Sequence, residues 1–198
     1  MRKLISSAAL VLSLAGAAVA QGAQQYKIDP NHSSANFTVK HMMVSTVHGR
    51  FTKMSGIIDY DPADPSKDKV SAVIDAASIT TDVAPRDNDL RSDHFFDVAK
   101  YPEIKFESTK VEKRGDQLVA IGNLTMKDVT REIELPFEVA AVKNEIGVTA
   151  KLTINRQDYH ITWNHIADGV VAVSNDVNIE INLEAKKPPP ADGAKSGK

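Results

Sequence analysis

Apolar and polar residues alternate with a period of two along most of the chain. The alternation is clearest in four stretches, at 118–126, 132–139, 148–155 and 177–184. A period of two is typical of a β-strand with one apolar face and one face toward water. Less regular alternation predicts four further strands, at 35–41, 50–60, 70–79 and 104–112. Gly56, within the second of these, indicates a bulge or a tight bend.

The connections between these strands are mostly short and rich in turn-forming residues, so strands adjacent in sequence should pair antiparallel. A Greek-key sandwich needs long crossovers, whereas 78–102 is the only long connection here. We therefore predict an all-β fold, an eight-stranded antiparallel up-and-down barrel of the lipocalin-like kind. A short helix is expected within the insert, at 87–92, and a second helical turn at 156–160. The interior of such a barrel is either filled by side chains or holds one small ligand.

The two ends of the chain differ from the barrel region. Residues 1–20 combine Arg2 and Lys3 with an apolar run that ends in small residues. This pattern predicts a signal peptide cleaved after Ala20; a membrane anchor is the alternative, but the run is short and alanine-rich for a span. Residues 21–186 then form the barrel domain, and 187–198, dominated by Pro, Gly and Lys, form a disordered tail. Export predicts a periplasmic location, with secretion as the alternative, and no stable membrane insertion.

Composition excludes several classes of function. The formal net charge is −2, and about −4 once Arg2 and Lys3 are removed, with no basic block that would mark a nucleic-acid surface. The chain has no cysteine, which excludes disulfides, thiolate metal sites and thiol catalysis. Six histidines occur, none in a His-x-His or His-x₃-His pair. Asp93, His94 and Asp97 are the best metal cluster in the sequence, but we predict no metal site.

The insert at 78–102 interrupts the alternation and carries a set of charged candidates. Asp87 is placed to cap the short helix through its carboxylate. Arg86 either pairs with one of the insert acids, Asp89, Asp93 or Asp97, or meets a carbonyl or phosphate at the mouth of the barrel. Asp97 is expected to stabilise the turn before Pro102.

Aromatic residues and a histidine supply further candidates. In an extended chain Phe95 and Phe96 would point to opposite sides, so that one plugs the barrel while the other packs outside or lines the entrance. His41 falls in phase with Phe37 and points inward, where it either hydrogen-bonds near the strand end or contacts the polar end of a ligand. Trp163 lies in a turn-rich stretch and either packs at the rim or contacts a ligand.

Four motifs together resemble the YceI-like family, whose members are exported bacterial proteins described as polyisoprenoid-binding. They are HSSANFTVKHMMVSTVHGRF at 32–51, the insert with SITT, RDNDLRS, FFD and YPEIKFEST at 78–109, GNLTMKDVTREIEL at 122–135 and INRQDY at 154–159. The resemblance runs from about Tyr26 to Ala185. Many members carry glycine where this chain has His160, so that turn is expected to differ. The resemblance implies a lipocalin-like barrel without enzymatic activity whose interior takes a long apolar chain, such as an isoprenoid quinone.

With this resemblance, the apolar strand faces are interpreted as the wall of a ligand tunnel rather than as packed core alone. About ten ligand carbons, two isoprene units, would contribute ~8 kcal/mol gross, comparable to ~1 μM affinity before ordering costs. The predicted ligand-binding residues are Phe37, Val39, His41, Phe51, Ile74, Arg86, Asp87, Phe95, Phe96, Phe106, Leu124, Phe137, Leu152, Ile154, Trp163, Val177 and Ile179.

The predicted function is an exported protein that holds a long-chain isoprenoid or similar amphiphile for transport, storage or sequestration. We expect no cofactor beyond the bound lipid and no nucleic-acid partner; a homodimer is an open alternative. Two other classes stay open. One is a hydrolase or metal-dependent enzyme that uses acids of the insert, although no Gly-x-Ser-x-Gly, His-Glu-x-x-His or phosphate loop occurs. The other is a filled barrel with a structural or interaction role.

Overall fold

The computed structural model describes residues 22–164, 166–167 and 170–189, so the predicted signal peptide and residues 190–198 of the predicted tail lie outside it. The strands are β1 (Gln24–Ile28), β2 (Ser34–His41), β3 (Ser45–Phe51), β4 (Met54–Tyr60), β5 (Lys69–Asp75), β6 (Ile79–Thr80), β7 (Glu103–Arg114), β8 (Gln117–Met126), β9 (Val129–Val142), β10 (Glu145–Asn155), β11 (Ile166–Ala167), β12 (Val170–Val171) and β13 (Asp176–Lys186). The α-helix α1 spans Ala84–Arg91, and 3₁₀ helices span Pro65–Lys67, Ala76–Ser78 and Arg156–Tyr159. Among the described residues, no helix has the length and hydrophobicity needed to cross a bilayer.

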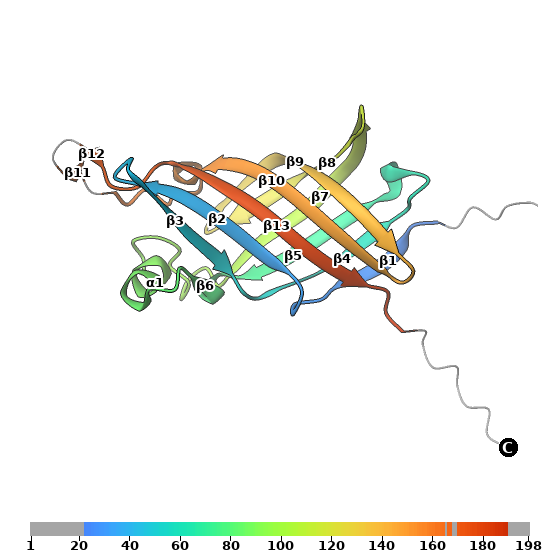
Figure 1. Cartoon of the computed structure of the whole chain (residues 1–198), viewed down its shortest axis with the longest axis horizontal. Helices are drawn as coiled ribbons and strands as arrows, with labels where there is room; N and C mark the ends of the chain where they lie inside the picture. The colour runs from blue at the N-terminus through green and yellow to red at the C-terminus, as the bar shows by residue number, and fades with distance from the viewer. Residues whose placement is uncertain (1–21, 165, 168–169, 190–198) are drawn as a thin grey trace, which may run out of the picture.

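Within this part of the chain, eight strands form a closed antiparallel barrel in the order β1-β4-β5-β7-β8-β9-β10-β13. The ring closes where β13 pairs with β1, through Lys27 with Lys186 and Ile28 with Ala185. Further along, β13 also pairs with β2, and β3 and β6 continue the sheet from there, so the barrel is extended at one end. Figure 1 shows this end, where the β2–β3 hairpin and α1 project beyond the ring. The predicted eight-stranded up-and-down barrel is confirmed.

The least regular predicted strands differ most from the structure. The strand expected at 50–60 is two strands, β3 and β4, interrupted at Thr52 and Lys53. The strand expected at 70–79 ends at Asp75, where a 3₁₀ turn leads into β6. Sequence alternation did not reveal β1, because five residues are too few for a periodic signal.

Gly56 marks a close approach between two strands, and the bulge that was one of the two predictions for it is absent. The pairing of β4 with β5 runs through Gly56 and Ala72 without a register shift. A Cβ at Gly56 would come within 2.2 Å of the Ser71 carbonyl oxygen, so only glycine fits there without a shift of the backbone. The register shift lies instead on β7, between Ser108 and Lys110, opposite β8.

One end of the barrel is closed by packed side chains. Ile28, Val111, Ile146 and Ala185 are each 1% exposed or less. Ala185 on β13 pairs with Ile28 on β1 and with Ile146 on β10, so these three residues span adjacent strands, and Val111 adds a side chain from β7. Burying a large aliphatic side chain contributes about 1.5–3 kcal/mol, so the closed end stabilises the fold without help from a ligand.

The loop that connects β4 to β5 carries an unusual buried acid. The Asp61 amide donates to Asp68 Oδ1 at 2.7 Å, whereas Asp68 Oδ2 is buried without a hydrogen-bond partner among the described residues. Burial raises the pKa of Asp68 to about 6, opposed by the Asp61 hydrogen bond and reinforced by the negative charges of Asp61 and Asp64. Folding therefore shifts the protonation equilibrium of Asp68 toward the protonated form.

This pKa predicts that Asp68 destabilises the protein as pH rises. Below pH ~4 the carboxyl is protonated in both the folded and the unfolded chain, and above about pH 6 it is ionised in both. The stability contributed by Asp68 therefore falls between these values, by up to about 3 kcal/mol. Urea unfolding of wild type and Asp68→Asn at pH 4.5 and 7.5 measures the effect as the difference between the two proteins.

Asp64→Asn, in the same loop, is the matched control, because the stability that Asp64 contributes changes with pH in the opposite direction. Hydrogen bonds from Ser66 and Lys67 lower the pKa of Asp64, so its contribution is lost as pH falls rather than as it rises. An Asp68→Asn protein whose stability changes with pH as the wild type's does would contradict the assignment.

Candidate functional site

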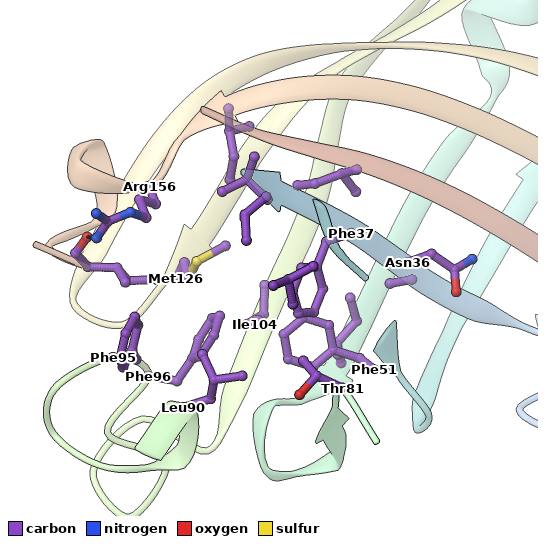
Figure 2. Close-up of a pocket in the computed structure, with 18 of the residues that line it drawn as sticks. Asn36, Phe37, Phe51, Thr81, Leu90, Phe95, Phe96, Ile104, Met126 and Arg156 are labelled. Carbon is purple, nitrogen blue, oxygen red and sulfur yellow. Dashed lines mark hydrogen bonds between the residues drawn. The ribbon is translucent and has the colours of Figure 1, made fainter. Parts of the chain in front are cut away.

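The open half of the barrel encloses a cavity of about 580 Å³. This volume lies within the range of small-molecule binding sites, and its wall is almost entirely apolar. Side chains from the barrel strands and from the 78–102 insert converge on it, as Figure 2 shows for Phe37, Phe51, Phe96 and Ile104. The packed end described above forms its floor, so the cavity is a blind pocket rather than a through tunnel.

Strand alternation explains how the wall forms. On β13 the residues Val177, Ile179, Ile181 and Leu183 all face the cavity, while the residues between them face outward. Fifteen of the seventeen predicted residues line the cavity: Phe37, Val39, His41, Phe51, Ile74, Arg86, Phe95, Phe96, Phe106, Leu124, Leu152, Ile154, Trp163, Val177 and Ile179. Other wall residues, such as Met126, Leu135 and Ile181, were not predicted, although the same alternation places them in phase with predicted ones.

Two predicted residues do not line the cavity. Phe137 faces inward on β9, but it pairs with Leu118 and Ala150 and packs in the core beyond the cavity. Alternation identifies the inner face of a strand but not the depth along the barrel, which is why Phe137 was misplaced. The other is Asp87, which is buried outside the cavity wall.

Asp87 holds the start of the insert together instead of capping α1. The helix begins after Val83, which places Asp87 inside its first turn. Its carboxylate accepts hydrogen bonds from the Thr81 amide at 2.7 Å, from Thr80 Oγ1 at 2.9 Å and from the Thr81 hydroxyl. Burial on its own raises the pKa of Asp87, but the hydrogen bonds from Thr81 and Thr80 outweigh it and lower the pKa overall.

Arg86 does not pair with an insert acid, contrary to one predicted alternative. Its Nε donates to Thr81 Oγ1 at 2.7 Å and its Nη2 to the Thr81 carbonyl at 3.1 Å. The side chain is half-buried and lines the cavity. Thr81 thus positions both Arg86 and Asp87, and the guanidinium faces the pocket.

Phe95 and Phe96 both face the cavity, so the prediction of opposite sides is wrong. The segment is not extended: the Phe95 amide donates to the Ser92 carbonyl at 3.1 Å and the Phe96 amide to the Leu90 carbonyl at 3.1 Å. Phe95 packs on Trp163 with ring centroids 5.2 Å apart, and Phe96 packs edge-to-face on Phe51 at 5.5 Å. These contacts join the insert to the barrel wall.

Asp97 forms the predicted turn through its backbone. It adopts a left-handed conformation, with φ 47°. Its carbonyl accepts hydrogen bonds from the amides of Lys100 at 2.9 Å and Tyr101 at 2.8 Å. This turn returns the chain from the insert to β7.

Arg156 is a charged cavity residue that sequence reasoning missed. Its side chain is only 4% exposed and follows β10 in the predicted helical turn, confirmed as a 3₁₀ helix. The guanidinium donates to four backbone carbonyls and one side-chain amide: those of Ile161 (2.6 Å), Trp163 (2.8 Å), Ser174 (3.0 Å), Val173 (3.3 Å) and Asn175 Oδ1 (3.3 Å). Burial lowers the pKa of Arg156. Five N–H donors on five acceptors hold the segments 161–163 and 173–175 together. Figure 2 shows Arg156 among the residues that line the pocket.

His160 ends the helical turn that begins at Arg156. Its backbone is left-handed, with φ 57°, a conformation that glycine adopts without steric cost. Its Nδ1 lies 3.1 Å from Asp128 Oδ1, and its carbonyl accepts from Lys127 Nζ at 3.1 Å. Contacts with the β8–β9 turn therefore hold His160 in this conformation.

His41 and Trp163 lie at the rim of the cavity. His41 is exposed, lines the cavity and pairs with Val173 across an isolated β-bridge. Trp163 is 36% exposed and stacks on His94 with centroids 6.3 Å apart. Both residues can contact the polar end of a ligand whose apolar part lies deeper.

The acids of the insert do not gather around His94 as the best metal cluster in the sequence would require. His94 Nδ1 lies 2.8 Å from Asp89 Oδ1 instead. Within the described chain, the group of histidine and acid side chains close enough to share an ion is Asp29, His32 and Glu184. There Lys186 Nζ lies 2.9 Å from Asp29 and 2.9 Å from Glu184, and its hydrogen bond lowers the pKa of Asp29. An ammonium group thus already pairs with both carboxylates of this cluster.

Comparison with known proteins agrees with this architecture. A UPF0312 protein of Serratia proteamaculans is 35% identical over 188 residues, covering 91% of this chain and 93% of that protein. The crystal structure of a Campylobacter jejuni YCEI protein is 32% identical, with a TM-score of 0.65 over 76% of this chain and 90% of that one. A polyisoprenoid binding domain from Saccharophagus degradans has the same fold at 21% identity, with a TM-score of 0.67 over 85% of this chain and 100% of that one.

The sequence model of the YceI-like domain matches residues 26–185, which is the whole barrel from β1 to the end of β13 apart from its terminal residues. The match includes the insert, the Arg156 turn and every strand that lines the cavity. The chain therefore belongs to the YceI-like family.

Proposed function

We propose that this protein binds a long-chain isoprenoid, or a similar amphiphile, inside the open half of the barrel. The observation that carries the proposal is the blind apolar cavity of about 580 Å³. A packed interior leaves few voids larger than a water molecule, so a hollow of this size marks a ligand site. The solved Saccharophagus degradans relative is described as a polyisoprenoid binding domain, which supports the same ligand class here.

The mechanism is desolvation of the ligand chain against the apolar wall. Each buried CH₂ contributes roughly 0.8 kcal/mol, so about ten carbons contribute ~8 kcal/mol before ordering costs. The few polar lining residues include Arg86 on the insert and His41 at the rim. The apolar tail therefore enters first, toward the packed floor, and the polar end stays near these side chains.

We further propose that the protein works in the periplasm, after removal of residues 1–20, and carries, stores or sequesters its lipid there. The support is the signal-peptide pattern of the sequence. The proposal assigns no catalytic role to the insert: the Asp87 carboxylate is occupied by Thr80 and Thr81, and the Arg86 guanidinium by Thr81. These charges hold the insert in place beside the cavity.

Native mass spectrometry of the purified mature chain tests the proposal. Protein from its host should carry a hydrophobic ligand that solvent extraction releases, and delipidated protein should take up farnesol or a short-chain ubiquinone with one-to-one stoichiometry. Delipidated protein that takes up neither these probes nor a fatty acid would overturn the proposal.

A further inference from the structure

We propose that the tip of the β2–β3 hairpin, residues 42–44, docks on the surface of a lipid bilayer and brings the cavity mouth to it. This inference rests on the proposed lipid-binding function, since it concerns how the ligand reaches the site. The tip is here called the docking tip. Figure 1 shows it at the end of the barrel opposite the C-terminal end of β13.

The docking tip presents apolar side chains to water. Met43 is 68% exposed and Val44 is 88% exposed. The turn has left-handed residues at both central positions, with φ 52° at Met42 and 56° at Met43, and the Val44 amide donates to the His41 carbonyl at 3.1 Å. Turns of this type favour Asn-Gly, and methionine adopts the left-handed region rarely. The chain thus holds two methionines where polar residues or glycine fit with less strain.

The docking tip forms part of the cavity rim. The residues on either side of it, His41 and Ser45, line the cavity. The Met42 amide donates to the carbonyl of Ala172 at 2.9 Å, and Ala172 lines the cavity too. A surface that meets the docking tip therefore also lies beside the opening through which a ligand enters.

The charge of the hairpin suits an anionic lipid surface. Residues 34–51 contain Lys40 and Arg50 and no acidic residue, although the whole chain has a formal charge of −2. Arg50 pairs with Asp82 at 3.4 Å, so Lys40 carries the charge near the docking tip. Lys40 is exposed and donates from its ammonium to Thr46 Oγ1 at 2.8 Å, so its charge is not neutralised by this partner. The basic residues do not form a run in the sequence. Pairing of β2 with β3 places them on one hairpin.

Trp163 extends the same rim. Its ring is 36% exposed, and its backbone carbonyl is held by Arg156 beside the segment that carries Ala172. Tryptophan is enriched at the boundary between lipid and water, where its amphipathic ring sits at headgroup level. The rim therefore combines exposed aliphatic side chains, an aromatic ring and a local positive charge.

A bilayer fits the docking tip better than a protein partner does. A stable protein interface buries about 800 Å² per partner, which two side chains at the end of a hairpin do not supply. Shallow insertion of a few apolar groups with electrostatic attraction is enough for reversible membrane contact. An isoprenoid is poorly soluble in water, so its source is also a bilayer.

Flotation with vesicles of phosphatidylethanolamine and phosphatidylglycerol tests the inference. The mature wild-type chain should float with these vesicles, and less with pure phosphatidylcholine. The double variant Met43→Ser/Val44→Ser should lower the partition coefficient roughly tenfold, since it removes the apolar groups that insert. Lys40→Gln should lower it about fivefold, and only at low ionic strength.

Val142→Ser is the matched control. Val142 is 67% exposed beside the β9–β10 turn, at the opposite, closed end of the barrel. Its substitution by serine should leave flotation unchanged. Equal flotation of the wild type, the double variant and Val142→Ser would overturn the inference. So would a wild-type chain that does not float, or that self-associates through the docking tip in sedimentation without binding vesicles.

Uptake of farnesol from water separates this inference from the proposed function. Wild type and Met43→Ser/Val44→Ser should bind farnesol equally, because neither substitution lies in the cavity wall. Farnesol binding without vesicle flotation would overturn the inference that the docking tip binds a bilayer, and would leave the proposed function standing. Flotation that depends on the tip, in a chain that binds no lipid, overturns the proposed function and with it the assignment of the tip to ligand entry.

Discussion

Replacing Leu152 with aspartate is expected to weaken binding of an apolar chain by at least about 100-fold. Leu152 lies on β10 with its side chain in the cavity wall, opposite Ile179 on β13. A carboxylate there keeps its hydration while the cavity is empty, but must lose it when an apolar ligand enters. Titration of the delipidated variant with farnesol measures the loss.

Two further variants control this result. Leu152→Asn changes polarity without charge, and should weaken binding less than aspartate does while keeping the fold. Thr149→Asn changes an exposed position on the outer face of the same strand, and should leave affinity unchanged. Wild-type affinity in a folded Leu152→Asp protein would show that the ligand does not lie against this wall.

Replacing Arg156 with leucine is expected to destabilise the protein by about 3–5 kcal/mol. The variant removes donors from four carbonyls, but that of Val173 keeps the Asn164 amide at 2.9 Å. The carbonyls of Ile161, Trp163 and Ser174 lose the Arg156 donor, and buried acceptors without a partner cost about 1–3 kcal/mol each. Water can reach some of them at the rim, so the sum is smaller than three full penalties. Urea unfolding measures the loss, and amide exchange should quicken first in 161–164 and 172–175.

Arg131 is the natural comparison for Arg156. It also donates to a backbone carbonyl, that of Asp158 at 2.9 Å, but its side chain is exposed. Arg131→Leu should therefore cost less than about 1 kcal/mol. Arg156→Lys should restore little of the stability, because an ammonium lacks the planar fork that reaches acceptors on two segments. Equal, small losses in all three variants would show that the Arg156 clamp does not hold the rim.

Most of the cavity wall was predictable, because a strand with one buried face repeats every second residue. Val177 and Ile179 on β13 and Leu152 and Ile154 on β10 were placed on the inner face from the pattern alone, and they line the cavity. The same pattern gives no distance along the barrel axis. Phe137 therefore shares the inner face with the cavity residues but packs in the core beyond the cavity.

The insert was located from the sequence but not understood from it. Its charges predicted ion pairs among Arg86 and nearby acids, whereas Arg86 and Asp87 both bond to Thr81. The Phe95–Phe96 pair was assigned to opposite faces on the assumption of an extended chain. Short polar segments have no periodicity, so local turns and contacts with distant strands decide how their side chains point.

By itself the sequence determined most of the strands, the antiparallel barrel and the YceI-like family, because alternation and short turns are local properties that many residues report together. Only the tertiary structure decided that the barrel is packed at one end and hollow at the other, since that depends on how side chains from opposite strands meet. It also decided the role of Arg156, whose guanidinium donates to five acceptors that lie up to 19 residues away in the sequence. The physical reason is the same in both cases: a period along the chain reports which face is buried, and contacts across the fold determine what fills the space behind it.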